Sequence, residues 1–317
     1  MLSVEHALNH AVVGQKEVAR SLIIAMLCRG NVLLEGMPGL AKTRAIKSLA
    51  TLVEGSFSRI QFTPDMLPSD VTGTEIYLGA EQGFEFRKGP IFGNLILVDE
   101  INRAPAKVQA ALLEAMEERQ VTVAGNTHIL PEFFLTLATQ NPVEQEGTYT
   151  LPEAQLDRFL LKVQVNYPSK QDEIEVLRIV REEKRLQTVT EEHEAVTSLS
   201  QDDIFACWQA VGDVYVSEAV ERLIVDLVHG TREPAGIDSS LTESLRYGAS
   251  PRGSLALEHT ARAHAWLEDR DHVIPEDVIA MAKPTLRHRI ALSYKAQMHE
   301  QNPDSIIDTL IDGVLKG

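Results

Sequence analysis

The feature that most limits the fold is an octapeptide, Gly36-Met37-Pro38-Gly39-Leu40-Ala41-Lys42-Thr43, which follows the apolar run 32–34 and opens an amphipathic stretch. In α/β folds such a loop joins a buried strand to a helix, and its backbone N–H groups and the helix N-terminus bind phosphate. Lys42 would pair with the β- and γ-phosphates, and the Thr43 hydroxyl would ligate Mg²⁺. Ala41 stands where the usual GxxxxGK[ST] pattern has its last glycine. The octapeptide predicts a nucleoside triphosphate site, and a simple turn before a helix is the alternative.

A second signal lies at the end of another apolar run. Residues 94–98 read Asn-Leu-Ile-Leu-Val and are followed by Asp99 and Glu100. Such a run is typical of a fully buried parallel strand, and open α/β sheets bind ligands at the carboxyl ends of these strands. Asp99 would hold the Mg²⁺ coordination sphere through water, and Glu100 would polarise the attacking water. A solvated helix start is the alternative, but together with the upstream loop the pair indicates a nucleotide hydrolase.

The chain changes character at about residue 168. Strand-like and helix-like segments alternate before it, which predicts a parallel sheet with helices on both faces, and helical patterns dominate after it. We therefore expect an α/β domain over 1–167 and a smaller all-helical domain over 168–317. Two hairpins should interrupt the first domain, one over 75–87 with its tip at 79–83 and one over 120–130. The expected strands are 32–34, 58–62, 95–98, 134–138 and 160–165, and the expected helices include 42–53, 105–118, 171–183, 202–210, 217–231, 252–267 and 275–283.

Three further polar residues are candidates for the site. Asn141 follows a buried strand and could orient the lytic water or sense the γ-phosphate, although a turn residue before proline has the same pattern. Arg158 could stabilise the transferring phosphoryl group, or it could simply pair with Asp157 or a helix end. Arg252 opens a helix, where the dipole disfavours a cation, and this suggests that it faces an anion such as the nucleotide.

Composition limits the classes of partner and the compartment. The formal net charge is -16 and the pI is about 5.1, which is unfavourable for clamping nucleic-acid phosphates. Cys28 and Cys207 are far apart and lack metal-ligand spacing, which fits a reducing compartment. The first ten residues do not read as a signal peptide, and no apolar run approaches the roughly 20 residues that span a bilayer. We expect a cytoplasmic protein without direct membrane insertion.

Taken together, these motifs resemble those of the AAA+ ATPases, and their detailed sequences resemble those of the MoxR family within them. The octapeptide is similar to that family's GxPGxAKT loop, so Ala41 is a trait of the family. Val13-Gly14-Gln15 is similar to the segment that lies beside the adenine. The resemblance covers nearly the whole chain, and the other matching stretches are 62–70, 99–104, 138–142, 151–159 and 250–252.

The resemblance implies a homo-oligomeric ring, usually a hexamer, with ATP and Mg²⁺ between neighbouring subunits. Arg158 would reach the next subunit's nucleotide, and both hairpins would face the pore or an axial partner. MoxR-like proteins are regarded as chaperone-like remodelers that assist maturation or cofactor insertion of client proteins, often with a partner that has a von Willebrand A domain. Arg103 is a further candidate for an intersubunit contact, unless it pairs with Glu100. The residues expected to act on the subunit's own ATP are Lys42, Thr43, Asp99, Glu100, Asn141 and Arg252.

Two rival functions belong to related ring ATPases. A nucleic-acid motor of the helicase or loader type is disfavoured by the net charge of -16 and by the lack of a dense Lys/Arg run. The motor subunit of a metal-chelatase-like complex would need a separate catalytic subunit, and this sequence contains no metal-ligand cluster of its own. The sequence favours a protein remodeler over both of these functions.

Overall fold

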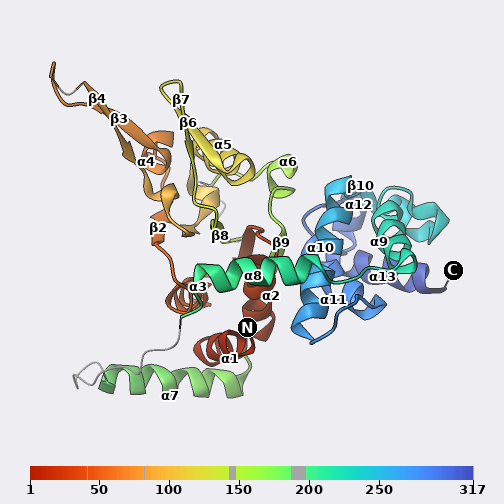
Figure 1. Cartoon of the computed structure of the whole chain (residues 1–317). Coiled ribbons are helices and arrows are strands. Elements are labelled where there is room, and N and C mark those ends of the chain that lie inside the picture. The colour runs from red at the N-terminus through yellow and green to blue at the C-terminus, as the bar shows by residue number, and fades with distance from the viewer. Residues whose placement is uncertain (41, 82, 143–147, 187–197, 317) are drawn as a thin grey trace. The chain divides into compact units, whose positions relative to one another are not determined.

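A five-stranded sheet forms the centre of the first part of the chain, in a computed structural model that describes residues 1–40, 42–81, 83–142, 148–186 and 198–316 (Figure 1). The strand order is β2-β5-β8-β1-β9, and β2 with β5, β5 with β8 and β8 with β1 pair in parallel. Because these strands pair in parallel, the chain must return to the other end of the sheet between one strand and the next, and such crossover connections usually contain a helix. The strands are β1 (Val32–Gly36), β2 (Phe57–Gln61), β5 (Leu95–Asp99), β8 (Leu135–Gln140) and β9 (Leu161–Val165).

Apolar residues at strand and helix spacing build the core around this sheet. All five residues of β5 are buried, as a central parallel strand requires. Helix α3 buries Ala45, Ile46 and Leu49 on one face and packs on β5 and β8. The sheet with its helices confirms the predicted α/β class. The helices of this part are α1 (Leu2–Ala11), α2 (Lys16–Leu27), α3 (Lys42–Thr51), α4 (Pro68–Thr72), α5 (Ala106–Glu118), α6 (Glu153–Leu156) and α7 (Lys170–Leu186), with short 3-10 turns at Pro90–Phe92 and Ile101–Arg103.

Both predicted hairpins are present and lie against each other. One pairs β3 (Gly73–Tyr77) with β4 (Phe84–Lys88), and the other pairs β6 (Gln120–Val123) with β7 (Asn126–Ile129). The Phe86 ring stacks on the His128 ring with centroids 3.8 Å apart, and Asn126 donates to Glu75 at 3.3 Å. Toward the tip of the first hairpin, whose Gln82 lies outside the described residues, the Phe84 side chain is 68% exposed. The hairpins form one paired projection with apolar side chains at its end.

The last third of the chain is helical, as expected, with one small addition. A two-stranded antiparallel pair joins β10 (Leu245–Tyr247) to β11 (Ala291–Leu292). Asp277 in the first turn of α11 is fully buried and accepts two hydrogen bonds from Arg270, each of 2.6 Å. His264 on α10 lies 2.7 Å from the same carboxylate, so this residue pins α10 to α11. The helices are α8 (Gln201–Gly212), α9 (Glu218–Gly230), α10 (Pro251–Leu267), α11 (Pro275–Leu286), α12 (Tyr294–Met298) and α13 (Pro303–Lys316), with 3-10 turns at Pro234–Gly236 and Ser239–Glu243.

The chain forms two compact units, and neither is a single stretch of sequence. Unit 1 comprises 1–23, 32–150 and 163–204, and unit 2 comprises 24–31, 151–162 and 205–317. The short segment 151–162, which includes Arg158, therefore packs with the helices of the last third of the chain. None of the helices in the described part is long and apolar enough to cross a membrane.

Candidate active site

The predicted phosphate loop leaves the carboxyl end of β1 and enters α3. Gly39 has φ +84, and a Cβ built on it would meet no atom within 4 Å, so the backbone here uses a conformation that favours glycine and faces open space. Lys42 is half-buried, and its Nζ donates to the carbonyls of Gly36 and, at 3.2 Å, Gln140. The Lys42 ammonium thus lies between the ends of β1 and β8. Met37, Pro38 and Leu40 complete the loop, and Ala41 lies outside the described residues.

Asp99 ends β5 with its carboxylate fixed on both sides. Its Oδ1 accepts from Thr43 Oγ1 at 3.3 Å and from Thr139 Oγ1 at 3.1 Å, and Arg59 Nε donates to its Oδ2 at 2.7 Å. The residue is only 5% exposed. A buried carboxylate is stable when its oxygens are bonded in this way, and its negative charge then lies beside the first turn of α3. Asp99 and Thr43 are therefore adjacent although they are 56 residues apart in the chain.

Glu100 follows Asp99 in a left-handed backbone conformation, with φ 56 and ψ 54. Non-glycine residues adopt this conformation at a cost of about 1–3 kcal/mol and persist in it where the surroundings hold them, often at functional sites. Here the Glu100 N–H donates to Thr139 Oγ1 at 3.0 Å. Its Oε2 accepts from Gln61 at 2.9 Å and forms an ion pair with Arg103 at 3.2 Å. The local pairing of Arg103 with Glu100 that the sequence left open is present.

Asn141 directly follows β8, which lies between β5 and β1 in the sheet. It is buried, with 5% exposure, and its carbonyl accepts from Asn102 at 3.4 Å. The structure thus brings Lys42, Thr43, Asp99, Glu100 and Asn141 to the carboxyl ends of three adjacent strands. That edge is where parallel α/β sheets bind their ligands.

Sequence reasoning missed three residues that touch the acidic pair. Arg59 and Gln61 come from β2, which is in register with β5 so that Gln61 lies opposite Asp99. Thr139 from β8 bridges Asp99 and Glu100 with one hydroxyl. The signal for the β2 residues was the alternation of polar Arg59 and Gln61 around buried Ile60, which places two polar side chains on one face of a strand.

The turn at Val13 and Gly14 lies after α1 and packs against the start of α7. Gly14 has φ +76, and an added Cβ would lie 2.9 Å from Asp172, so a side chain is excluded here. Gln15 donates to the carbonyl of Asn166 at 2.6 Å, which ties the turn to the end of β9. The turn is therefore held by two segments that are more than 150 residues away in the chain.

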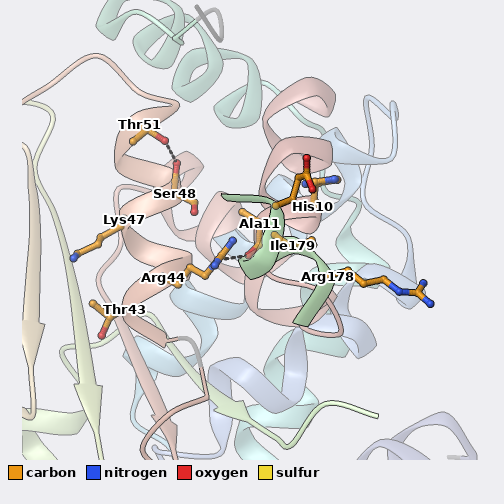
Figure 2. A pocket seen from close by; sticks show the side chains of 10 residues that line it. His10, Ala11, Thr43, Arg44, Lys47, Ser48, Thr51, Arg178 and Ile179 are labelled. Atoms are coloured by element: carbon orange, nitrogen blue, oxygen red, sulfur yellow. Dashed lines mark hydrogen bonds between the residues drawn. The ribbon is translucent and has the colours of Figure 1, made fainter. Parts of the chain in front are cut away.

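A cleft of about 1320 Å³ lies between α1, α3 and α7 and includes Thr43 in its lining. Figure 2 shows the Lys47 and Arg178 side chains extending from α3 and α7, and the Arg44 guanidinium turned back to donate to the carbonyl of Ala11 at 2.9 Å. Among the described residues that line it, Arg44, Lys47 and Arg178 are cationic and Glu182 is acidic. The cleft begins at the phosphate-loop helix and can accept the polar part of an anionic ligand.

Arg158 and Arg252 belong to unit 2. Arg158 lies in the turn between α6 and β9, and its N–H donates to the carbonyl of Gln155 at 3.2 Å. Arg252 lies in the first turn of α10, where its N–H donates to the Ser250 side chain at 3.2 Å. The neighbouring Asp157 forms an ion pair with Arg289 at 3.0 Å. The Asp157 carboxylate thus has Arg289 as a partner, and its alternative pairing with Arg158 stays a prediction.

These groups fit a magnesium nucleotide. Mg²⁺ prefers hard oxygen ligands, and a hydroxyl and a carboxylate already meet at Thr43 and Asp99. Phosphate oxygens need several N–H donors and a cation, which the loop around Gly39 and the Lys42 ammonium can supply. The donor set therefore suits a nucleoside triphosphate with its metal ion.

Known proteins are similar to this chain in both sequence and fold. Residues 31–161 match the family described as "ATPase family associated with various cellular activities (AAA)", and residues 238–310 match "AAA lid domain". Chaperone MoxR1 of Mycobacterium tuberculosis is 42% identical over 304 residues, which cover 96% of this chain and 78% of that protein. Protein MoxR of Paracoccus denitrificans is 33% identical, with 97% and 92% covered. A crystal structure from Cytophaga hutchinsonii has a TM-score of 0.89 and 43% identity, with 98% of this chain and 93% of that chain covered.

Proposed function

This chain belongs to the MoxR family of AAA+ ATPases, and we propose that it hydrolyses ATP in a ring of identical subunits in order to remodel client proteins. The relative named Chaperone MoxR1 supports the chaperone-like role, because 96% of this chain aligns with it. The proposed ring is a hexamer, with a core domain over 1–167 and a lid domain over 168–317. We place it in the cytoplasm, where ATP is available and where two separate cysteines stay reduced.

In the proposed site each subunit binds its own ATP at the edge of the sheet. Lys42 neutralises phosphate charge, and Thr43 and Asp99 hold Mg²⁺, Asp99 through water. The metal ion would supply charge neutralisation and polarise the phosphate oxygens. Glu100 accepts a proton from the attacking water, and Asn141 orients that water. Val13 and Gly14 would lie beside the base, and residues 36–41, including Ala41, would surround the phosphates.

Two arginines complete the proposed site from outside the sheet. Arg252 would contact the subunit's own nucleotide, and Arg158 would contact the nucleotide of the next subunit. A guanidinium remains charged and is planar, so it can stabilise the charge that spreads over the transferring phosphoryl group. Because Arg158 acts in trans in this proposal, hydrolysis requires the ring.

We propose that the paired hairpins engage the client protein or a partner with a von Willebrand A domain. The supporting feature is their exposed apolar end, where Tyr77 and Phe84 are 59% and 68% exposed and their ring centroids lie 5.1 Å apart. Exposed aromatic side chains of this kind are typical of protein-recognition sites. The formal charge of -16 disfavours nucleic acid as the substrate.

The observation that carries the proposal is the Thr139 hydroxyl, which donates to Asp99 at 3.1 Å and accepts from the Glu100 N–H at 3.0 Å. One side chain thus fixes the proposed metal-binding carboxylate relative to the proposed base. Such fixed placement is what hydrolysis of a bound nucleotide requires.

The test mixes two inactive variants, Arg158→Ala and Glu100→Gln, under conditions that allow subunit exchange. Each variant alone should bind ATP and hydrolyse it poorly, by a loss on the order of a thousandfold for Arg158→Ala. In mixed rings, an Arg158→Ala subunit keeps its own Glu100 and receives an intact Arg158 from its neighbour. ATPase activity should therefore return on mixing. Confirmed exchange without any return of activity would refute the action of Arg158 in trans.

A further inference from the structure

The segment that carries Arg158 is held by side chains from the end of unit 2. The Asp157 carboxylate accepts from Ser250 Oγ at 3.0 Å, and its other oxygen forms an ion pair with Arg289 Nε at 3.0 Å. On the other side of Arg158, the carbonyl of Phe159 accepts from Arg289 Nη2 at 2.8 Å. Arg289 therefore fixes the residues on both sides of Arg158.

Arg289 is an unusually buried cation. Its side chain is 3% exposed, and burial lowers the pKa of Arg289 to about 10 although the Asp157 carboxylate opposes this shift. It remains charged at neutral pH, and Nη1 also donates to the carbonyl of Leu160 at 3.1 Å. Burial also lowers the pKa of the adjacent His288 well below its usual range, so that ring is neutral and adds no second charge. Most of the Arg289 donors are directed at residues 157–160, which suits a role in placing that segment.

The same contacts reach the start of α10. Ser250 is the N-cap of α10, and its Oγ accepts from the Arg252 N–H at 3.2 Å while it donates to Asp157. A Cβ built on Gly253 would lie 3.5 Å from the Arg289 side chain, so the first turn of α10 packs against Arg289. The Asp157 carboxylate therefore contacts two groups at the start of α10. One is Ser250, which caps the turn that carries Arg252, and the other is Arg289, which packs against that turn.

We propose that Asp157 and Arg289 are positioning residues for Arg158, and that Ser250 ties this position to the first turn of α10, which carries Arg252. The inference rests on the proposed function, in which Arg252 contacts the subunit's own nucleotide and Arg158 contacts the next one. A shift of the first turn of α10 then moves Asp157 and, with it, the arginine that serves the neighbouring site. The contact couples adjacent ATP sites of the ring.

Asp157→Asn tests the positioning role because it keeps the shape of the side chain and removes its charge. We expect kcat for ATP to fall about a hundredfold, as for a catalytic group displaced by about 1 Å, with little change in KM. The double variant Asp157→Asn/Arg158→Ala should be no slower than Arg158→Ala alone. A multiplied loss in the double variant would show that Asp157 acts elsewhere and would overturn the proposal.

Mixing with Glu100→Gln separates this role from a general structural one. An Asp157→Asn subunit retains its own Glu100, and a Glu100→Gln neighbour provides a correctly placed Arg158, so activity should return. The matched control is Arg287→Lys, in the same loop, whose side chain bonds to Asp304 at 2.8 Å and to the carbonyl of Lys162 at 3.2 Å. It should retain nearly full activity.

The outcomes distinguish the two proposals. If the Arg158→Ala mixture recovers activity and the Asp157→Asn mixture does not, the positioning role is wrong and the action of Arg158 in trans stands. If neither mixture recovers while exchange is confirmed, the action in trans is wrong and the positioning proposal is rejected with it.

Ser250→Gly tests the link to α10. Glycine is an acceptable N-cap, so the helix start should persist while the hydroxyl that bonds Asp157 is removed. We expect ATPase activity to fall about fivefold, which corresponds to the free energy of one hydrogen bond. Mixing with Glu100→Gln should restore this activity. Ser250→Thr keeps the hydroxyl and should behave as wild type. If mixing does not restore the ATPase activity lost in Ser250→Gly, the defect lies in the subunit's own ATP site, and the proposed link between Asp157 and α10 is refuted.

Discussion

Replacing Asp277 by asparagine should destabilise the packing of α11 on α10, the helix that carries Arg252, much more than a typical charge substitution does. The Asp277 carboxylate is fully buried, and each of its oxygens accepts a 2.6 Å hydrogen bond from Arg270. It also accepts from the Ile274 N–H at 2.9 Å at the start of α11. Breaking a buried pair by removing one charge typically costs 3–5 kcal/mol, and because the Arg270 side chain is 24% exposed we take the lower end, about 3 kcal/mol. Since each kcal/mol of lost stability lowers the midpoint temperature of thermal unfolding by about 2–4 °C, that temperature should fall by roughly 6–12 °C.

The pH dependence supplies a second, independent readout. Burial raises the pKa of Asp277, but the hydrogen bonds from Arg270, the Ile274 backbone and His264 outweigh it and hold the pKa below its usual range. A depressed carboxyl pKa contributes stability that is complete above the unfolded value of about 3.9 and is lost as pH falls through the folded value. The difference between wild type and Asp277→Asn should therefore be full at pH 7 and should shrink below about pH 4.

Thermal unfolding followed by circular dichroism at pH 7 and at lower pH measures both effects. The control is Glu218→Gln, which removes an exposed pair with Arg222 whose side chains are 77% and 73% exposed, and it should stay within about 0.5 kcal/mol of wild type. If Asp277→Asn shifted the midpoint no more than this control, or if its deficit did not shrink in acid, the buried carboxylate would not hold α10 and α11 together as described.

Two further predictions concern the proposed function. Lys42→Ala should abolish ATP binding and leave the far-UV circular dichroism spectrum unchanged. The reason is that the half-buried ammonium bonds to loop and strand carbonyls and fills no core position. Unchanged ATP affinity would contradict the phosphate-loop assignment. Deleting 79–83 should leave basal ATPase intact and reduce binding of a client or partner, since the tip of the first hairpin lies beyond the paired residues Tyr77 and Phe84, and normal client maturation by that variant would argue against a recognition role.

Local sequence signals were sufficient for much of the fold and for part of the site. The phosphate loop, the acidic pair after β5 and both hairpins each depend on residues that are close in sequence, and the strands and hairpins formed where the patterns predicted. Arg59 was missed because its contact with Asp99 depends on which strand lies beside β5, and strand order is not a local property. The role of Arg289 depends on packing between residues 132 positions apart. A buried arginine has no periodic signature, so only the folded chain identifies it.

The discontinuous composition of unit 2 has a consequence for anyone who builds chimeras between members of this family. A lid exchanged at residue 168 would separate Arg289 and Ser250 from the Asp157 with which they fit, because residues 151–162 pack with the lid while preceding the cut. The hybrid would combine a carboxylate from one parent with an arginine and a serine from the other. A graft that transfers 24–31, 151–162 and 205–317 together keeps these partners matched, so recombination in this family should respect the three segments of unit 2 rather than one boundary.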